Sequence, residues 1–204
     1  MSYSAPLRDM QFVLNEVFDA GSLFASMPAT AEITPELIAA ILEEAGKVAS
    51  NLLEPLNRSG DEEGCSFQQG QVSTPAGFRD AYRQFAEGGW VGLSGDAAYG
   101  GQGMPKMLAV CFEEMIMGAN TSLALYAVLS AGASLALARH ATEALKQRYL
   151  PKLYDGSWAA TMCLTEAHAG TDLGIIRTRA EPQADGSYLI TGGKIFITGG
   201  EHDL

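Results

Sequence analysis

Two short polar stretches joined by a turn decide how this 204-residue chain is interpreted. Residues 162–172 read Met-Cys-Leu-Thr-Glu-Ala-His-Ala-Gly-Thr-Asp, and residues 192–200 read Gly-Gly-Lys-Ile-Phe-Ile-Thr-Gly-Gly. The first stretch combines hydroxyls, carboxylates and a glycine turn, and the second is typical of a strand that ends in a hydroxyl. Loops of this kind place backbone N–H groups and hydroxyls against a polar ring or phosphates. The two stretches therefore predict a ligand-binding site.

The spacing of apolar residues changes after Gly156, from a helical period to an alternating one. Helix starts are expected at the cap signals, which are Thr34-Pro35-Glu36, Thr74-Pro75, Pro105, Asn120-Thr121-Ser122 and Thr142-Glu143. Strands are expected over residues 158–164, 174–180, 188–191 and 194–198. Helices followed by strands predict an α+β fold, with an all-helical domain before a β-sheet or barrel domain and no alternating βαβ units.

Two loops separate the expected helices. Residues 55–77 are rich in glycine, serine, glutamine and acid, and we expect them to lack regular structure. Residues 90–103 form a glycine-rich loop whose Gly100-x-x-Gly103 pattern is open to two interpretations. It could hold a phosphate, but no strand precedes it and no complete GxGxxG is present, so a turn between helices is favoured.

Composition and charge exclude several classes of protein. Hydrophobic residues make up 47% of the chain and charged residues 18%, as in a folded protein. The formal net charge of −11 argues against nucleic acid or an anionic membrane as the main partner. A phosphate-bearing ligand would need a local cluster such as Arg177, Arg179 and Lys194, although these residues fit solvated strand positions as well.

The same composition predicts a cytoplasmic location. The three cysteines are scattered and form no CxxC pair, which favours reduced thiols. The N-terminus lacks a signal peptide, and no long uninterrupted apolar run predicts a membrane span. His168 has no second His or Cys at ligand spacing, so we expect no metal site.

The two stretches carry a resemblance to a known family. The pattern is Leu164-Thr165-Glu166-x-x-x-Gly170-Thr171-Asp172 followed by Gly192-x-Lys194-x-Phe196-Ile197-Thr198. It resembles the flavin-binding middle domain of the acyl-CoA dehydrogenase family. Upstream, Tyr99-Gly100-Gly101-x-Gly103 is similar to that family's helical domain. The N-terminal segment and His168 resemble one branch, which includes 3-methylmercaptopropionyl-CoA dehydrogenases and bacterial fatty acyl-CoA dehydrogenases. That segment could equally be a strap packed on the protein's own surface.

The resemblance implies three parts for the chain. These are an N-terminal extension over residues 1–33, a helical domain over 34–156, and the first part of a β domain over 157–204. It also implies further β strands and a C-terminal helical bundle, neither of which is present here. We therefore expect the chain to be the N-terminal portion of a longer protein.

The implied reaction is FAD-dependent α,β-dehydrogenation of an acyl-CoA thioester to the trans-2-enoyl-CoA. An electron-transfer flavoprotein as acceptor and a homodimer or homotetramer are further implications of the resemblance. An acyl-CoA oxidase, a flavin monooxygenase of the same fold, or a non-catalytic acyl-CoA-binding module are the alternatives.

The resemblance also implies roles for individual residues. FAD would be bound by the following side chains, with Thr171 reaching either the cofactor pyrophosphate or the substrate: Met162, Thr165, Thr171, Phe196 and Thr198. Phe196 would pack on the flavin ring where many relatives have tryptophan. The family's catalytic glutamate belongs to the C-terminal bundle, so no residue of this chain is assigned as catalytic, and the chain alone should be inactive. The carboxylates weighed and not assigned are Glu113, Glu114 and Glu166.

Overall fold

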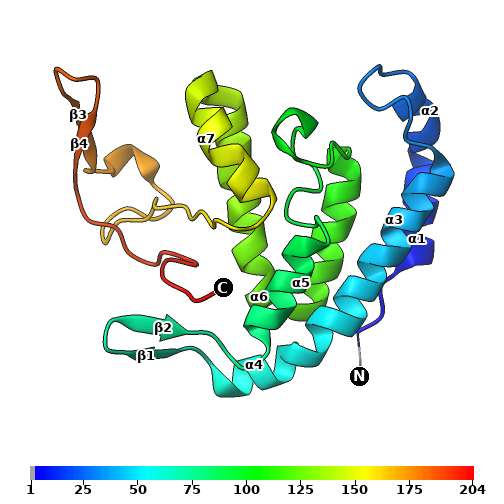
Figure 1. Cartoon of the computed structure of the whole chain (residues 1–204), viewed down its shortest axis with the longest axis horizontal. Helices are drawn as coiled ribbons and strands as arrows, with labels where there is room; N and C mark the ends of the chain where they lie inside the picture. Colours follow the sequence, from blue (N-terminus) through cyan, green and yellow to red (C-terminus); the bar gives the residue numbers. More distant parts are fainter. Residues whose placement is uncertain (1–2) are drawn as a thin grey trace.

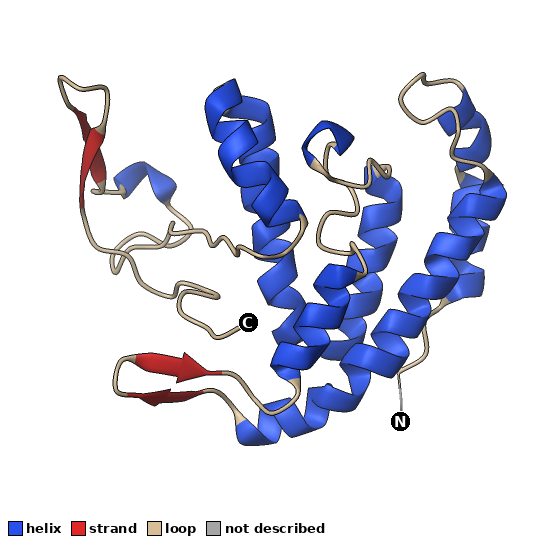
Figure 2. Ribbon diagram, viewed as in Figure 1, coloured by secondary structure: helices blue, strands red, loops and turns tan. Residues whose placement is uncertain are grey.

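Helices dominate the chain up to residue 154, and turns, loops and one short hairpin follow (Figures 1 and 2). The computed structural model describes residues 3–204. The α-helices are α1 Leu7–Phe12, α2 Ala20–Ala25, α3 Pro35–Lys47, α4 Asn57–Glu63, α5 Phe78–Glu87, α6 Lys106–His140 and α7 Glu143–Tyr154. Shorter π-helical and 3₁₀ turns are η1 Val13–Val17, η2 Val48–Leu53, η3 Glu54–Leu56, η4 Ala97–Tyr99 and η5 Leu173–Ile175.

Two antiparallel hairpins complete the described structure. In the first, β1 Ser66–Gln68 pairs with β2 Gln71–Ser73, and Phe67 lies opposite Val72. In the second, β3 Arg179–Pro182 pairs with β4 Tyr188–Thr191, and Ala180 lies opposite Ile190. Figure 1 shows the second hairpin standing away from the helices, on the side opposite α1 and α2. The predicted α+β class is confirmed: β3 and β4 follow the last α-helix, whereas β1 and β2 lie between α4 and α5.

The start of α3 follows from local sequence. Thr34 is the N-cap residue, and its Oγ1 accepts a hydrogen bond of 3.3 Å from the Leu37 backbone N–H. Pro35 occupies the first turn, where its missing N–H leaves no bond unmade. The apolar face then buries Ile38 and Leu42 completely. This prediction is confirmed in full, since every signal involved lies within one helical turn.

The long helix α6 consists of two helices joined at a break. Asn120 has non-helical backbone angles of φ −157° and ψ 88°, and it is fully buried. Its Oδ1 accepts hydrogen bonds from the Leu123 N–H at 3.1 Å and from the Ser122 hydroxyl at 2.9 Å. These are the bonds of an N-cap, so the predicted helix start at Asn120 is confirmed.

Helix α6 is the centre of the core. It packs against α3, η2 and α7, and it buries a row of mostly apolar side chains that includes Leu108, Phe112, Met115, Ile116 and Leu123. By length and composition alone it could cross a membrane, because its most apolar window reaches a mean hydropathy of 1.6. The core helix of a globular protein meets the same criterion, so α6 adds no argument for a span.

The structure overturns the prediction for residues 55–77. This segment holds η3, α4 and the β1–β2 hairpin in place of a loop. Glycine and acid at this density do not prevent a helix that packs against its neighbours, as α4 does against α6. The hairpin turn is also regular, with Gln69 and Gly70 at positive φ.

The predicted cap at Thr74 is wrong. Helix α5 begins at Phe78 after Gly77, and no side chain caps it. Thr74 instead uses both its N–H and its hydroxyl to donate to Asp203 Oδ1, at 3.0 and 2.6 Å. A contact between residues so distant in the chain overrides a local capping signal.

The strand predictions are correct for residues 188–191, and in the predicted strand 174–180 they are correct for residues 179–180, which begin β3. Residues 158–164 and 194–198 form no regular strand, and residues 173–175 form a 3₁₀ turn. Phe196 has a φ of 57°, which interrupts the pleat of the second stretch.

The N-terminal segment is helical over α1, η1 and α2, and only part of its apolar surface is buried. Met10 and Leu14 are the buried residues, whereas Phe12 and Phe18 are each 58% exposed. The segment packs on α3 through α1. The aromatic side chains of Phe12 and Phe18 therefore cover little of the helical core.

Candidate functional site

Two segments that contain most of the predicted ligand residues run side by side. The Ile195 N–H donates a hydrogen bond of 3.0 Å to the Thr165 carbonyl oxygen. Further along, the Thr161 hydroxyl donates to the Thr198 carbonyl oxygen. Residues 161–165 and 195–198 thus run antiparallel, although neither is a regular strand. Four of the predicted residues come together in this pair: Met162, Thr165, Phe196 and Thr198.

The paired segments present an exposed apolar surface beside hydroxyl groups. Phe196 is 87% exposed and Met162 is 63% exposed. Thr165 is half-buried, and Thr198 is exposed. Phe196 also lies in the left-handed region, with a φ of 57°, which is costly for a residue with a side chain. An aromatic ring offered to solvent from a strained position fits stacking against a planar ligand.

Thr171 lies apart from the paired segments, in the turn that follows Gly170. It is exposed, and the next residue, Asp172, caps η5 through a hydrogen bond of 3.0 Å from the Gly174 N–H to Oδ1. The contact that we predict between Thr171 and a pyrophosphate or the substrate stays a prediction.

Glu166 is the buried centre of this region. Its side chain is only 3% exposed. Oε2 accepts from the Arg177 N–H at 2.9 Å, and Oε1 accepts from the Thr178 N–H at 2.9 Å and from Lys194 Nζ at 3.0 Å. His168 Nε2 stands 3.4 Å from Oε2. Hydrogen bonds from Thr178, Arg177 and Lys194 hold the pKa of Glu166 well below its ordinary value of 4.5.

Lys194 does not belong to a free cationic cluster. Its Nζ is shared between Glu166 Oε1 and the Leu164 carbonyl oxygen, at 3.0 and 2.8 Å. The hypothesis that Lys194 joins Arg177 and Arg179 in a phosphate site therefore loses one of its three members. Arg177 and Arg179 remain exposed, as expected of solvated positions.

The glycine-rich loop between α5 and α6 is folded onto itself. The N–H groups of residues 100–104 all donate to carbonyl oxygens of the same loop, including Gln102 to Gly92 at 2.9 Å and Gly103 to Gly95 at 2.8 Å. Gly101 packs directly on the backbone of Gly95. No amide of residues 100–104 is left for a phosphate, so the interpretation as a turn is favoured.

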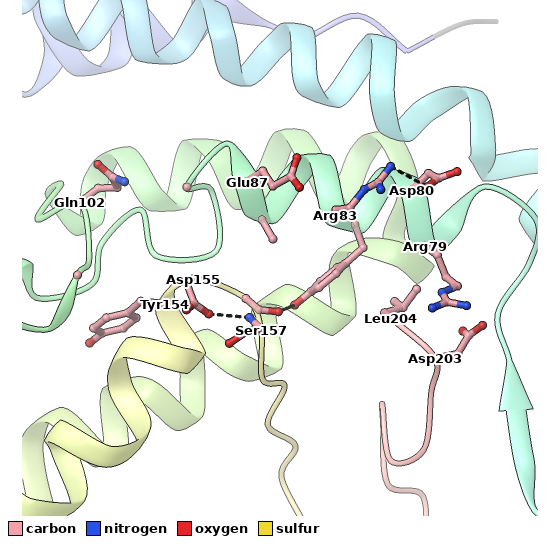
Figure 3. A pocket seen from close by; sticks show the side chains of 15 residues that line it. Arg79, Asp80, Arg83, Glu87, Gln102, Tyr154, Asp155, Ser157, Asp203 and Leu204 are labelled. Carbon is pink, nitrogen blue, oxygen red and sulfur yellow. Dashed lines mark hydrogen bonds and ion pairs between the residues drawn. The ribbon is translucent and has the colours of Figure 1, made fainter.

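A hollow of about 1040 Å³ lies beside α5, and no residue of the paired segments lines it (Figure 3). Its lining holds two arginines and four carboxylates: Arg83 pairs with Asp80 at 2.9 Å, Arg79 points toward Asp203, and Glu87 and Asp155 are in excess. Mixed charge of this kind gives no preference for an anionic ligand. A smaller hollow of about 360 Å³ is bordered by Glu166, His168, Arg177 and Lys194. Within residues 3–204, no group of three or more His, Cys, Asp or Glu side chains is placed to hold a metal ion.

Residues 35–157 match the N-terminal domain of the acyl-CoA dehydrogenases. The chain belongs to the acyl-CoA dehydrogenase family. It is 41% identical over 204 residues to 3-methylmercaptopropionyl-CoA dehydrogenase of Ruegeria pomeroyi, which covers 100% of this chain and 34% of that protein. It is 36% identical over 207 residues to a butyryl-CoA dehydrogenase of Syntrophomonas wolfei, with the same coverage of 100% and 34%. The chain thus spans about a third of the length of these two relatives.

Solved acyl-CoA dehydrogenases share the fold. An acyl-CoA dehydrogenase from Bacillus anthracis, crystallised with FAD, aligns with a TM-score of 0.68 at 24% identity, over 83% of this chain and 27% of its own. Butyryl-CoA dehydrogenase from Megasphaera elsdenii aligns with a TM-score of 0.65 at 24% identity, over 78% and 40%. The predicted family is confirmed, and so is the fold class.

Sequence reasoning missed the centre of the site. Glu166 and Lys194 were noted as members of the two family motifs, yet neither was assigned a role toward the other. The only signal was that the first motif holds carboxylates, Glu166 and Asp172, and the second holds one lysine, Lys194. Thr161, which joins Thr198, carried no signal in the sequence.

Proposed function

We propose that the whole protein is an FAD-dependent acyl-CoA dehydrogenase, which converts an acyl-CoA thioester to the trans-2-enoyl-CoA. The observation that carries this proposal is the antiparallel pairing of residues 161–165 with 195–198. It brings an exposed aromatic ring, a thioether and two threonines together, in a chain that belongs to this family. FAD is the proposed cofactor, and it would supply the acceptor for the hydride that leaves the β carbon.

The residues on the paired segments fit a flavin. Phe196 would pack on the flavin ring. Its backbone is strained, and strained residues are often found at ligand-binding sites, which supports this role. Thr165 and Thr198 would offer hydroxyl and backbone groups to the polar edge of the ring. Met162 would line the same surface with a polarisable thioether. Thr171 would reach the pyrophosphate or the substrate from the adjoining turn.

Glu166 is not proposed as the base that removes the α proton. A general base works best with a pKa near the operating pH, and the pKa of Glu166 lies far below it. Its oxygens are also occupied by two backbone N–H groups and Lys194. Glu113 accepts a hydrogen bond of 2.8 Å from Lys106. No carboxylate of this chain is assigned to proton removal, so the chain alone should show no turnover.

Short acyl-CoA thioesters are the proposed substrate class, because two relatives that match the whole chain are named for butyryl-CoA and 3-methylmercaptopropionyl-CoA. An electron-transfer flavoprotein is the proposed acceptor of electrons, and a homodimer or homotetramer the proposed assembly. We also propose a cytoplasmic location. The division into an extension (1–33), a helical domain (34–156) and part of a β domain (157–204) stays a prediction.

The test is a visible absorption spectrum of the whole protein, purified under mild conditions and then mixed anaerobically with a panel of acyl-CoA thioesters. A flavin spectrum that bleaches with one thioester supports the proposal and identifies the substrate. A colourless protein that takes up no added FAD overturns it and favours a non-catalytic acyl-CoA-binding module. Rapid oxygen consumption during turnover would instead favour an oxidase or a monooxygenase of the same fold.

A further inference from the structure

The buried carboxylate of Glu166 joins three segments that are separate in the sequence. It extends from the first motif, it accepts hydrogen bonds from the N–H groups of Arg177 and Thr178, and it accepts a third from Lys194 in the second motif. A buried charge is tolerated when it is paired and hydrogen-bonded in this way. Glu166 therefore determines where residues 177–178 and 194 lie relative to its own loop.

Lys194 makes the connection in the other direction. Its Nζ donates to Glu166 Oε1 and also to the Leu164 carbonyl oxygen, at 3.0 and 2.8 Å. The adjacent residue, Ile195, donates its N–H to the Thr165 carbonyl oxygen at 3.0 Å. The Lys194 side chain and the Ile195 backbone N–H thus bind the same three consecutive residues, 164–166.

Besides the bond from the Thr161 hydroxyl to the Thr198 carbonyl oxygen, the pairing of residues 161–165 with 195–198 has little else to fix its register. The described contacts include only one backbone–backbone hydrogen bond between the two segments, at Ile195 and Thr165. Two extended segments held so weakly can slip, and a slip of one residue moves every side chain to the opposite face. An ion pair that fits only one alignment prevents the slip, because any other alignment would leave a buried charge unpaired.

We propose that the ion pair of Glu166 and Lys194 is a positioning device, which fixes the register that places Phe196 and Thr198 against Met162 and Thr165. The inference rests on the proposed flavin site, and it assigns the two charged residues to holding that site. Neither residue touches the reacting atoms in this role.

The test compares variants of the whole protein by titration with FAD, followed through the quenching of free FAD fluorescence. Lys194→Met removes the cross-segment bond but leaves the two backbone N–H donors on Glu166. Glu166→Gln removes the charge and presents an amide N–H₂ group toward Lys194 or a backbone N–H. Each should weaken FAD binding by about 10-fold or more, as expected for the loss of a charged hydrogen bond. The double variant should be little weaker than either single variant, because both remove the same interaction.

Two further measurements separate positioning from general destabilisation. Lys194→Arg keeps the charge and should restore FAD affinity to within about threefold of the wild type. The flavin absorption maximum should shift in Lys194→Met and Glu166→Gln, since the ring would meet different neighbours. Asp185→Ala is the matched control: it removes the acceptor of two hydrogen bonds that Ser187 donates at the turn of the β3–β4 hairpin, outside the paired segments. It should leave both affinity and absorption maximum unchanged.

The outcomes separate this inference from the proposed function. Wild-type protein that binds FAD while both variants bind it equally well, with an unshifted spectrum, overturns the positioning role and leaves the proposed function standing. Wild-type protein that binds no FAD overturns both. Loss of affinity in the variants with rescue by Lys194→Arg supports the inference. Circular dichroism of the helices establishes that each variant compared is folded.

Discussion

Asn120 Nδ2 donates a hydrogen bond of 3.1 Å to the Leu53 carbonyl oxygen, and so joins the break in α6 to the end of η2. Leu53 is the last residue of the π-helical turn η2, where the helical path changes to the 3₁₀ turn η3. The same Asn120 side chain caps the second half of α6 through Oδ1. One fully buried amide therefore satisfies helix ends on two different elements.

Replacing Asn120 by alanine should destabilise the fold strongly. The change leaves the Leu53 carbonyl oxygen and the Leu123 N–H without partners in a buried place, at a cost of roughly 2–4 kcal/mol in the free energy of unfolding. Urea denaturation followed by circular dichroism measures it. Thr121→Ala is the control, because the exposed Thr121 hydroxyl only donates back to Met117 within the helix, and its loss should change stability by less than about 0.5 kcal/mol. Equal effects of the two variants would contradict the role of Asn120.

Two threonines at helix starts should differ in their contribution to stability. Thr34 accepts a hydrogen bond from Leu37, whereas Thr142 stands at the start of α7 with no side-chain cap bond. Thr34→Ala should lower the free energy of unfolding by about 1 kcal/mol, and Thr142→Ala by clearly less. Thermal or urea unfolding of the two variants side by side makes the comparison. A larger loss for Thr142→Ala would show that cap geometry does not determine the effect.

Acid should destabilise the wild type partly through Glu166. Its pKa is lowered in the folded state relative to the ordinary value of 4.5, so the unfolded chain binds a proton first as the pH falls. The contribution of Glu166 is fully present above pH 4.5, and it is lost progressively as the pH falls from that value toward the lowered pKa. Urea midpoints from pH 6 to pH 3 should therefore fall less steeply for Glu166→Gln than for the wild type. Parallel pH profiles would rule out an ionised, hydrogen-bonded Glu166.

Phe196 should matter for FAD and not for folding. Its ring is 87% exposed, so Phe196→Ala removes almost no packing within this chain. Phe196→Gly should even relieve the positive φ, with a gain of roughly 0.5–1 kcal/mol. Either change should weaken FAD binding about 5- to 100-fold, by analogy with the roughly 1–3 kcal/mol that aromatic stacking contributes per nucleic-acid base. Unfolding midpoints and FAD titrations on the same samples test the separation. Unchanged FAD affinity in both variants would remove Phe196 from the site.

Features of the fold that depend on neighbouring residues were predictable from the sequence. Helix α3 follows from Thr34, Pro35 and its apolar spacing, all within a few residues. The start of a new helix at Asn120 follows equally from its own side chain. What the sequence could not provide is the second partner of Asn120, because Leu53 lies 67 residues earlier.

Errors arose where distant contacts override local signals. Thr74 resembles an N-cap, yet it binds Asp203 from the far end of the chain. Residues 194–198 resemble a strand, but the strained backbone of Phe196 interrupts it. The candidate site shows the same contrast. The family motifs pointed to residues on both segments, but the bond between Glu166 and Lys194 could be found only in the folded structure.

The internal hydrogen bonds of the loop between α5 and α6 restrict which amino acids can replace its glycines. A Cβ at Gly101 would clash with the backbone carbonyl group of Gly95, so no other amino acid fits without moving backbone. Gly100 has a φ of 88° but open space around it, and asparagine could take its place. Among natural variants that keep this loop, position 101 should therefore always be glycine, whereas position 100 should vary.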